Sequence, residues 1–296
     1  MMTNRSSGIF CMLGAMAFIS VQEAFAKFLG EHLPVGQVVW ARYLGHLCLM
    51  LVILWPKYGN SIFKANRLPM QILRSLILLV DTLLFFYGLT LIGLAQATAI
   101  FFSVPALVVI LSYFLLAEQI RVPTMLAIAL GFVGTLIMVR PGFGQQSDEA
   151  LIGALAIFGA ACCTAIYNVI TRKLAGTDPL AVTLLYTAMI GAIASSIWVP
   201  FIWQTPQGSE QWLTLISIGL FGAVAHSLII MAHQYTLATI VAPFIYTQIF
   251  WALFFSWLIF RELPDIYAFI GGIVVIISGL YLVRSNRQHT KKTLPR

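Results

Sequence analysis

The stretch GIFCMLGAMAFISVQEAFAKFLGEHLP at residues 8–34 starts as an apolar helix and ends with the polar residues Gln22, Glu23 and Lys27. Its ending allows two interpretations. The sequence Ala-Phe-Ala at 24–26 is typical of the small-residue end of a cleaved signal peptide. Alternatively, the helix is a permanent part of the protein, and its polar end faces something other than lipid.

A second copy of this pattern lies 145 residues further along the chain, at 153–179. With this shift, five small or apolar positions coincide, namely Gly8, Gly14, Ala15, Leu29 and Pro34 with Gly153, Gly159, Ala160, Leu174 and Pro179. A shift of 144 aligns further positions of the two halves, Ser112, Glu118, Val139 and Arg140 with Ser256, Glu262, Val283 and Arg284. Signal peptidase does not cleave in the middle of a chain, so we interpret residues 8–34 as a structural helix of a duplicated chain.

The composition requires a membrane. The chain is 60% hydrophobic and 9% charged, whereas a soluble domain carries about 25% charged residues. The net charge of +7 does not indicate nucleic acid, because the basic residues fall between apolar runs and in the tail. The four cysteines also lie within apolar runs, without metal-binding or disulfide spacing, so we expect neither a metal nor another cofactor.

Apolar runs of about 20 residues are long enough to cross a bilayer. The chain has ten of them, at about 8–29, 36–55, 70–91, 95–116, 122–139, 151–173, 180–202, 212–232, 239–260 and 264–284. We therefore predict an all-α membrane protein with ten transmembrane helices. Each repeat contains five helices, which is an odd number, so the second repeat enters the membrane inverted relative to the first. The predicted domains of this inverted 5+5 repeat are 1–145, 146–288 and a basic cytoplasmic tail at 289–296.

Lysine and arginine are distributed unevenly between the two sides of the membrane. If the N-terminus is cytoplasmic, twelve lie on the inner side and three on the outer side. The outer ones are Lys27, Arg140 and Arg261, and the inner ones are Arg5, Lys57, Lys64, Arg67, Arg121, Arg172, Lys173, Arg284, Arg287, Lys291, Lys292 and Arg296. The positive-inside rule therefore predicts that both termini are cytoplasmic.

Inverted repeats are typical of secondary transporters, which bind substrate near the midplane between the repeats. The sequence contains no GxxxxGK[ST] motif, so transport must use a gradient or exchange. An intramembrane enzyme is an alternative, but no HExxH or GxSxG motif supports it. A channel is another alternative, and no filter segment is visible. We predict a transporter that is not an enzyme and has no catalytic residues.

Three stretches together with the ten-helix plan resemble the drug/metabolite transporter superfamily, in its EamA-domain branch. They are ATAIFFSVPALVVILSYFLLAE at 97–118, VVWARYLG at 38–45 and SWLIFRE at 256–262. The resemblance covers the whole chain, with the departure that Pro105 aligns with Ile249 and not with a proline. It implies a bacterial inner-membrane carrier for a small polar or aromatic metabolite, such as an amino acid, S-adenosylmethionine or riboflavin. Its partners would be the substrate and the lipid bilayer, and the protein would be a monomer or homodimer.

Four ionisable residues lie within the apolar spans, namely Glu23, Arg42, Arg74 and Asp81. Inserting an ionised side chain at the centre of a membrane helix costs about 2.5–3.5 kcal/mol. They must face the interior, pair with another group or reach the interface. We expect Glu23 either to form a local ion pair or to line a cavity with Gln22. We expect Arg42 to pair with Asp81, as part of the site or as a packing contact. Arg74 lies near the cytoplasmic end and is expected to be an interface anchor.

The repeat gives Gln22 and Glu23 polar counterparts in the sixth span. These are Tyr167 and Asn168, which we expect to face them across the pseudo-twofold axis. In the ninth span, Tyr246 and Gln248 stand beside aromatic residues, an arrangement that suits a flat organic ligand or a cation. The predicted substrate-binding residues are Gln22, Glu23, Arg42, Asp81, Tyr167, Asn168, Tyr246 and Gln248, and the candidates for carrying a coupling proton are Glu23, Asp81 and His226.

Overall fold

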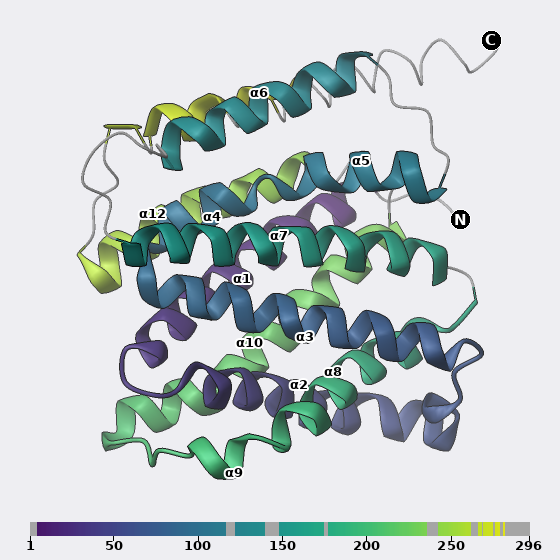
Figure 1. Ribbon diagram of the computed structural model, residues 1–296. Helices are drawn as coiled ribbons and strands as arrows, with labels where there is room; N and C mark the ends of the chain where they lie inside the picture. The colour runs from purple at the N-terminus through teal and green to yellow at the C-terminus, as the bar shows by residue number, and fades with distance from the viewer. Residues whose placement is uncertain are drawn as a thin grey trace, which may run out of the picture.

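The computed structural model describes residues 5–116, 122–139, 148–174, 177–235 and 242–261, and in the last span residues 266–267, 269–274, 276–278 and 281. All regular secondary structure in these ranges is helical. The longer helices lie roughly along one direction (Figure 1). They are α1 (Arg5–Gly30), α2 (Val35–Tyr58), α3 (Leu68–Leu91), α6 (Val122–Val139), α7 (Asp148–Leu174), α8 (Leu180–Ser196) and α10 (Gly208–Tyr235), with a short helix η1 (Gly59–Phe63) after α2.

Five of the described helical segments are long and apolar enough to cross a bilayer, namely Ser6–Gly30, Val35–Phe63, Leu68–Leu91, Asp148–Thr171 and Gly208–Ile229. Shorter apolar helices occupy Leu180–Ser196, Gln248–Phe260 and Phe269–Ser278. These segments coincide with predicted spans, so the chain is an all-α membrane protein.

Three predicted spans are divided, two of them where a proline enters the first turn of a new segment. In the ninth, the division comes at Gln248, five residues after a proline in the first turn of the preceding segment. The fourth span consists of α4 (Leu94–Phe101) and α5 (Val104–Leu116), and the seventh consists of α8 and α9 (Val199–Ile202). The ninth consists of η2 (Ala242–Thr247), α12 (Gln248–Phe255) and η3 (Ser256–Phe260). Pro105, Pro200 and Pro243 lack an N–H group, and the first turn is where a helix does not need one.

The helix packing repeats itself as an inverted duplication requires. The 145-residue shift places α1 on α7 and α3 on α10. In the structure α1 runs along α10, and α3 runs along α7, so the same pairing occurs twice. Figure 1 shows α3 and α7 side by side, with α2 and α8 below them. The predicted inverted fold is therefore confirmed, whereas the boundary near residue 145 stays a prediction because 140–147 lie outside the described residues.

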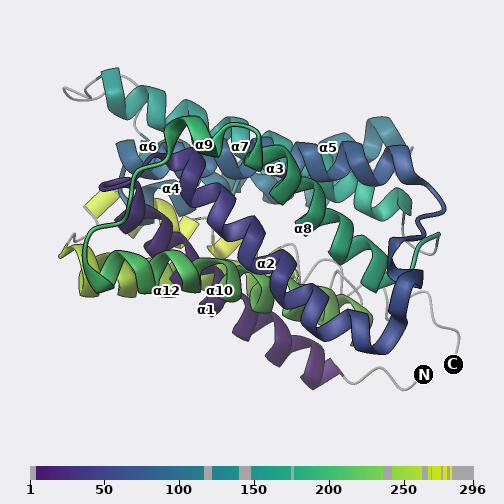
Figure 2. The same ribbon diagram turned by 90° about the horizontal axis from the view of Figure 1, so that it is seen from below.

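The bundle has two sides that meet at α2 and α8. Seen from below, α1, α10 and α12 lie on one side, and α3, α5 and α7 lie on the other (Figure 2). Helix α2 contacts both α10 and α8, and α3 contacts both α7 and α8. Any polar side chain at the contact of α2 with α3 therefore joins the two sides.

Glycine allows two pairs of helices to approach closely. A Cβ atom placed on Gly219 of α10 would lie 2.6 Å from the Cα atom of Gly45 in α2. On the other side, a Cβ atom on Gly88 of α3 would lie 3.0 Å from the carbonyl oxygen of Gly153 in α7. Small residues at such crossings bring membrane helices into backbone contact.

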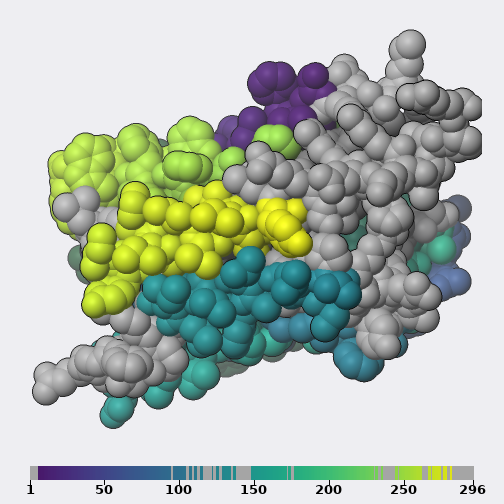
Figure 3. Space-filling model, turned by 90° about the horizontal axis from the view of Figure 1, so that it is seen from above, coloured from purple at the N-terminus to yellow at the C-terminus, as the bar shows by residue number. Residues whose placement is uncertain are grey.

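The outer faces of the bundle carry apolar side chains. Phe114, Val122, Leu130, Ile266 and Phe269 are each more than 40% exposed, as expected of side chains that contact lipid. Figure 3 shows α6 beside the segment around residues 266–278 on one such face. A Cβ atom on Gly131 would lie 3.2 Å from Ser278 Oγ, which places these two helices in contact.

Replacing Gly219 with alanine should loosen the crossing of α2 with α10. The new methyl group would meet backbone atoms that cannot rotate away, so we expect a loss of about 1–3 kcal/mol in stability. The measurement is the melting temperature of the purified protein in detergent. Gly14→Ala is the matched control, because its Cβ would contact only Leu228 Cδ1 at 3.4 Å. Equal melting temperatures for the two variants would contradict the close crossing.

Candidate functional site

Glu23 and Gln248 form a buried polar contact between the two halves of the chain. Gln248 stands at the start of α12, directly after the interruption of the ninth span, and its Nε2 donates to Glu23 Oε1 at 2.8 Å. Both side chains are about 95% buried, with 5% and 4% of their surface exposed. Glu23 Oε2 and the Oε1 atom of the neighbouring Gln22 are buried and have no hydrogen-bond partner among the described residues. Buried polar atoms are nearly always bonded, so these two oxygens require an explanation.

The interruption of the fourth span places another polar atom within one residue of the equivalent position. Under the 144-residue shift that aligns Pro105 with Ile249, Ser103 corresponds to Thr247, the residue directly before Gln248, and Ser103 lies between α4 and α5. Its side chain is buried, and its Oγ has no hydrogen-bond partner within the described ranges. Paired interruptions in corresponding spans are the best indicator of a binding site in an inverted-repeat transporter.

Arg42 on α2 is a buried cation with neutral partners. Its Nη1 donates to Thr82 Oγ1 on α3 at 3.2 Å, and its Nη2 contacts His226 Nε2 on α10 at 3.0 Å. Its Nε has no hydrogen-bond partner in the part of the chain that the structure describes. A guanidinium has no acceptor, so His226 Nε2 must accept, and the imidazole must be neutral with its proton on Nδ1. The guanidinium also lies over the ring of Tyr43, 4.7 Å from its centre.

The side chains of Gln22 and Arg42 converge on one point beside α10. A Cβ atom on Gly222 would contact Gln22 Oε1 and would lie 3.7 Å from Arg42 Nε. His46, one turn after Arg42, stacks on His226 with ring centres 6.0 Å apart, and its Nε2 is also buried without a partner. The unbonded atoms of three side chains from α1 and α2 therefore gather around this part of α10.

Asp81 on α3 has a different partner from the predicted one. Its Oδ1 accepts a hydrogen bond from Thr164 Oγ1 on α7 at 2.7 Å. The predicted pair of Arg42 with Asp81 does not form as a direct contact, because Arg42 bonds to Thr82 and His226, although the two charges still interact at a distance. Thr82 is the next residue along α3 from Asp81, and successive helical residues point about 100° apart. Asp81 therefore faces α7 while Thr82 faces α2.

Arg74 does not reach the interface as predicted. It is only 1% exposed and lies between α3, α7 and α8. Its Nη1 donates to Tyr167 Oη at 2.9 Å and to Thr171 Oγ1 at 3.3 Å. Its Nη2 donates to the Thr183 carbonyl oxygen at 2.8 Å and to the Thr187 hydroxyl. With four acceptors available, the side chain has no reason to extend toward water, which is why the expected snorkelling does not occur.

Tyr167 and Asn168, the predicted counterparts of Gln22 and Glu23, lie in two different environments. Tyr167 bonds to Arg74, and its ring centre is 4.9 Å from the guanidinium carbon. Asn168 is exposed and lies one turn beyond Thr164 on α7. Within the described part of the chain, neither residue contacts Gln22 or Glu23 through a hydrogen bond. The side chain of Tyr246 lies outside the described residues.

The two ends of the bundle are closed by related contacts. At the predicted outer end, Gln37 Nε2 donates to the Gln204 carbonyl at 2.8 Å, and Gln37 Oε1 accepts from the Gln204 N–H at 2.9 Å. At the predicted inner end, Asp178 accepts from the Asn66 N–H at 2.6 Å and from Gln71 Nε2 at 2.9 Å. These contacts occupy corresponding loops of the two repeats.

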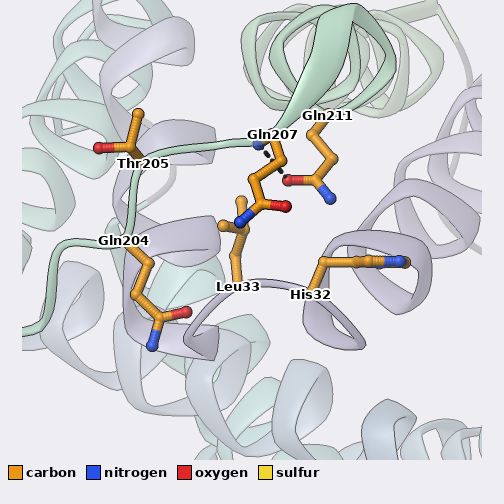
Figure 4. A pocket seen from close by; sticks show the side chains of 6 residues that line it. All are labelled: His32, Leu33, Gln204, Thr205, Gln207 and Gln211. Atoms are coloured by element: carbon orange, nitrogen blue, oxygen red, sulfur yellow. Dashed lines mark hydrogen bonds between the residues drawn. The ribbon is translucent and has the colours of Figure 1, made fainter.

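A surface cavity of about 500 Å³ lies at the outer end, lined by His32, Leu33, Gln204, Thr205, Gln207 and Gln211. Figure 4 shows these side chains around the turn between α1 and α2 and around the loop that precedes α10. The Gln207 N–H donates to Gln211 Oε1 at 2.8 Å, as the figure marks. The cavity is distinct from the buried cluster around Arg42 and Glu23, which carries the unbonded polar atoms.

Within the described ranges, no three histidine, cysteine, aspartate or glutamate side chains lie close enough together to hold a metal ion. The site residues that sequence reasoning missed are threonines, namely Thr82, Thr164 and Thr187. A hydroxyl in an apolar helix usually bonds to its own helix, so such residues give little signal in a sequence. Their position next to Asp81 and near Tyr167 was the only available indication.

Replacing Arg74 with methionine should destabilise the bundle. The change removes a hydrogen-bonded cation from among four oxygen acceptors, so we expect a loss of about 2–3 kcal/mol. Arg42→Met removes contacts to two neutral partners and should lower the melting temperature less. Melting temperatures of both variants in the same detergent provide the comparison. A smaller loss for Arg74→Met than for Arg42→Met would contradict this ranking.

The inner-end contact predicts a pH-dependent contribution to stability. Partial burial acts to raise the pKa of Asp178, but hydrogen bonds from Gln71 and the Asn66 backbone together lower it below its ordinary value. A lowered pKa stabilises the fold above the ordinary aspartate pKa of about 4, and this contribution is lost as the pH falls through the folded-state pKa.

Asp178→Asn should therefore melt at a lower temperature than wild type at pH 7, and the difference should shrink as the pH falls below about 4. The melting temperature is measured in detergent between pH 7 and pH 3. Glu210→Gln, at an acid in the first turn of α10, is the control. A difference from wild type that stays constant across this pH range would rule out the contribution of the carboxylate.

Comparison with known proteins places these features among transporters. Residues 6–140 and 151–285 each match the EamA-like transporter family. A protein named S-adenosylmethionine uptake transporter from Rickettsia conorii is 27% identical, with 96% of each chain covered. Its counterpart from Rickettsia bellii is 28% identical, covering 98% of this chain and 97% of its own.

A protein named pseudopaline exporter CntI from Pseudomonas aeruginosa is 24% identical and covers 95% of this chain and 97% of its own. One solved crystal structure matches 96% of this chain and 99% of its own with a TM-score of 0.70. At 17% identity that likeness shows the fold alone.

Proposed function

Because this chain belongs to the EamA-like transporter family, we propose that it carries S-adenosylmethionine, or a metabolite with the same amino-acid end, across the bilayer by alternating access. The family makes the protein a multi-pass membrane transporter for a small metabolite, in the drug/metabolite transporter superfamily. The substrate, the binding residues and the transport cycle are the proposal. We place the site between the repeats, near Gln22, Glu23, Arg42 and Gln248.

The observation that carries the proposal is the incomplete bonding of Arg42 and its neighbours. Arg42 is a buried cation whose described polar partners are the neutral side chains of Thr82 and His226, and its Nε is unbonded. The Asp81 carboxylate acts on Arg42 through its charge, but its Oδ1 bonds to Thr164, and no hydrogen bond joins it to the guanidinium within the described ranges. An anionic group on the substrate that bonds to the guanidinium directly would therefore be favoured there. A carboxylate is the group that a guanidinium binds best, through charge-assisted hydrogen bonds.

The neighbouring acid supplies the complementary charge. Glu23 Oε2 and Gln22 Oε1 are acceptors without donors, and an ammonium group is a donor without acceptors. S-adenosylmethionine carries a carboxylate, an ammonium and a sulfonium cation at one end, which suits an arginine and a glutamate from adjacent helices. The names of the two Rickettsia relatives support this choice of substrate. One relative is named for uptake and another for export, so the proposal concerns the substrate and not the direction.

The remaining sequence predictions complete the proposal. We retain four candidate binding residues because the sequence pattern supports them, namely Asp81, Tyr167, Asn168 and Tyr246. For a coupling proton, the contacts favour Glu23, which has an unbonded oxygen, over His226, whose Nε2 already accepts from Arg42. The lysine and arginine distribution supports cytoplasmic termini in a bacterial inner membrane.

Transport is tested with purified protein in proteoliposomes, by uptake and counterflow of labelled S-adenosylmethionine under an imposed gradient. We expect saturable flux, and a fall of at least about tenfold for Glu23→Gln and Arg42→Met, because each removes roughly 1.4 kcal/mol or more of substrate binding. Glu210→Gln and Arg67→Met change exposed charges and are the controls.

Full transport by both site variants would refute the binding site. Saturable flux of other metabolites, together with no flux of S-adenosylmethionine, would refute S-adenosylmethionine as the substrate. Product formation without flux would favour the intramembrane enzyme, and flux that does not saturate would favour a channel.

A further inference from the structure

We propose that Thr82 is a positioning residue for transport, because it holds the side chains of Arg42 and Tyr43 in the orientation that leaves Arg42 Nε open toward the substrate. The proposal rests on the proposed function in one respect, the assignment of Arg42 to substrate binding. The contacts themselves do not depend on which metabolite is carried.

The Thr82 hydroxyl makes three hydrogen bonds at once. Its hydrogen is directed to the Leu78 carbonyl oxygen, one turn earlier on α3, at 2.8 Å. Its oxygen contacts Arg42 Nη1 at 3.2 Å and Tyr43 Oη at 3.0 Å. Since the single hydroxyl hydrogen is already used, both Arg42 and Tyr43 must donate. The two lone pairs of the oxygen are thereby filled by two consecutive residues of α2.

These contacts determine where the guanidinium of Arg42 points. Nη1 is held by Thr82 from α3, and Nη2 is held by His226 from α10. A planar guanidinium fixed at two nitrogens has only one remaining direction for its Nε. That Nε is the unbonded atom near Gln22.

Tyr43 forms the floor under the guanidinium, and it is fixed as well. Its side chain is completely buried, and its ring is packed so closely on Gly191 of α8 that a Cβ atom there would overlap it. The hydrogen bond to Thr82 holds the hydroxyl end of this ring. Thr82 therefore fixes Arg42 directly and also through the ring beneath it.

Thr82 lies between the two sides of the bundle, so its hydrogen bonds depend on how the two sides are arranged. Helix α2 packs on α10, whereas α3 packs on α7. Thr82 bonds to α2, and the preceding residue Asp81 bonds to Thr164 of α7. A movement of α3 relative to α2 would therefore reorient Arg42, so substrate affinity would change with the arrangement of the two sides.

The test compares Thr82→Val with Thr82→Ser in proteoliposomes. Valine has nearly the shape of threonine but cannot accept a hydrogen bond, and serine restores the acceptor. We expect Thr82→Val to raise KM for S-adenosylmethionine about tenfold or more with Vmax within about twofold of wild type, because binding and not the conformational cycle is weakened. Thr82→Ser should restore KM.

Thr98→Val is the matched control. Thr98 is also a completely buried helical threonine that donates to the carbonyl four residues earlier, Leu94 O, at 2.9 Å. It differs from Thr82 in that its hydroxyl accepts no hydrogen bond from another helix within the described ranges. An equal rise in KM for Thr98→Val, or no rescue by Thr82→Ser, would overturn the positioning role.

A second measurement needs no substrate and separates the two proposals. In a double-mutant cycle of melting temperatures, Thr82→Val should destabilise the wild type more than it destabilises Tyr43→Phe, whose ring no longer has a hydroxyl to donate. The same cycle is run with Arg42→Met. Additive effects in both cycles would show that Thr82 holds neither side chain and would overturn the inference. Coupled effects together with no flux of S-adenosylmethionine in wild type would support the contacts and refute the substrate.

Discussion

A guanidinium can remain inside a membrane bundle only where other groups accept its hydrogen bonds. Arginine does not lose its proton in proteins and has no acceptor of its own. Neighbouring helices must therefore supply the oxygen and nitrogen acceptors that lipid cannot supply. Arg42 and Arg74 impose this requirement at two places, and the polar contacts between helices follow from it. Arg74 on α3 bonds to α7 and α8, and Arg42 on α2 bonds to α3 and α10.

The two arginines meet this requirement to different degrees. Arg74 donates to three hydroxyls and one carbonyl, which α7 and α8 provide. Arg42 donates to one hydroxyl and one imidazole, and the unbonded oxygens of Gln22 and Glu23 lie on the neighbouring helix. The Nε atom is unbonded in both arginines within the described ranges, so they differ in the number of their acceptors, four for Arg74 and two for Arg42. The cation with four acceptors is held more firmly in place, whereas the one with two retains more capacity for a ligand. This difference is the physical basis for assigning Arg74 to packing and Arg42 to transport.

Two features of the backbone allow these side chains to meet. The close crossing of Gly45 with Gly219 brings α2 against α10, so that Arg42 reaches His226 two turns further along α10. The interruptions of the fourth and ninth spans place Ser103 and Gln248 within one residue of equivalent positions in the two repeats. A regular, evenly spaced bundle of uninterrupted helices would bury apolar side chains at these points. Glycine and proline therefore determine where the polar interior can form.

The amino-acid sequence by itself determined the helical class, the position of the spans and the inverted duplication. These properties depend on hydrophobic runs, on loop charges and on similarity between residues 8–34 and 153–179, all of which are local or periodic along the chain. It also identified Glu23, Arg42 and Gln248 as polar residues in apolar spans, since such residues are conspicuous wherever they occur.

Only the tertiary structure decided which of these residues meet. It replaced the predicted pair of Arg42 with Asp81 by contacts to Thr82, His226 and Thr164, and it buried Arg74. Sequence spacing within one helix defines a face, but partners across helices depend on crossing angle and rotation, which long-range packing sets. A threonine that accepts two hydrogen bonds from a neighbouring helix is indistinguishable, in sequence, from one that bonds only to its own.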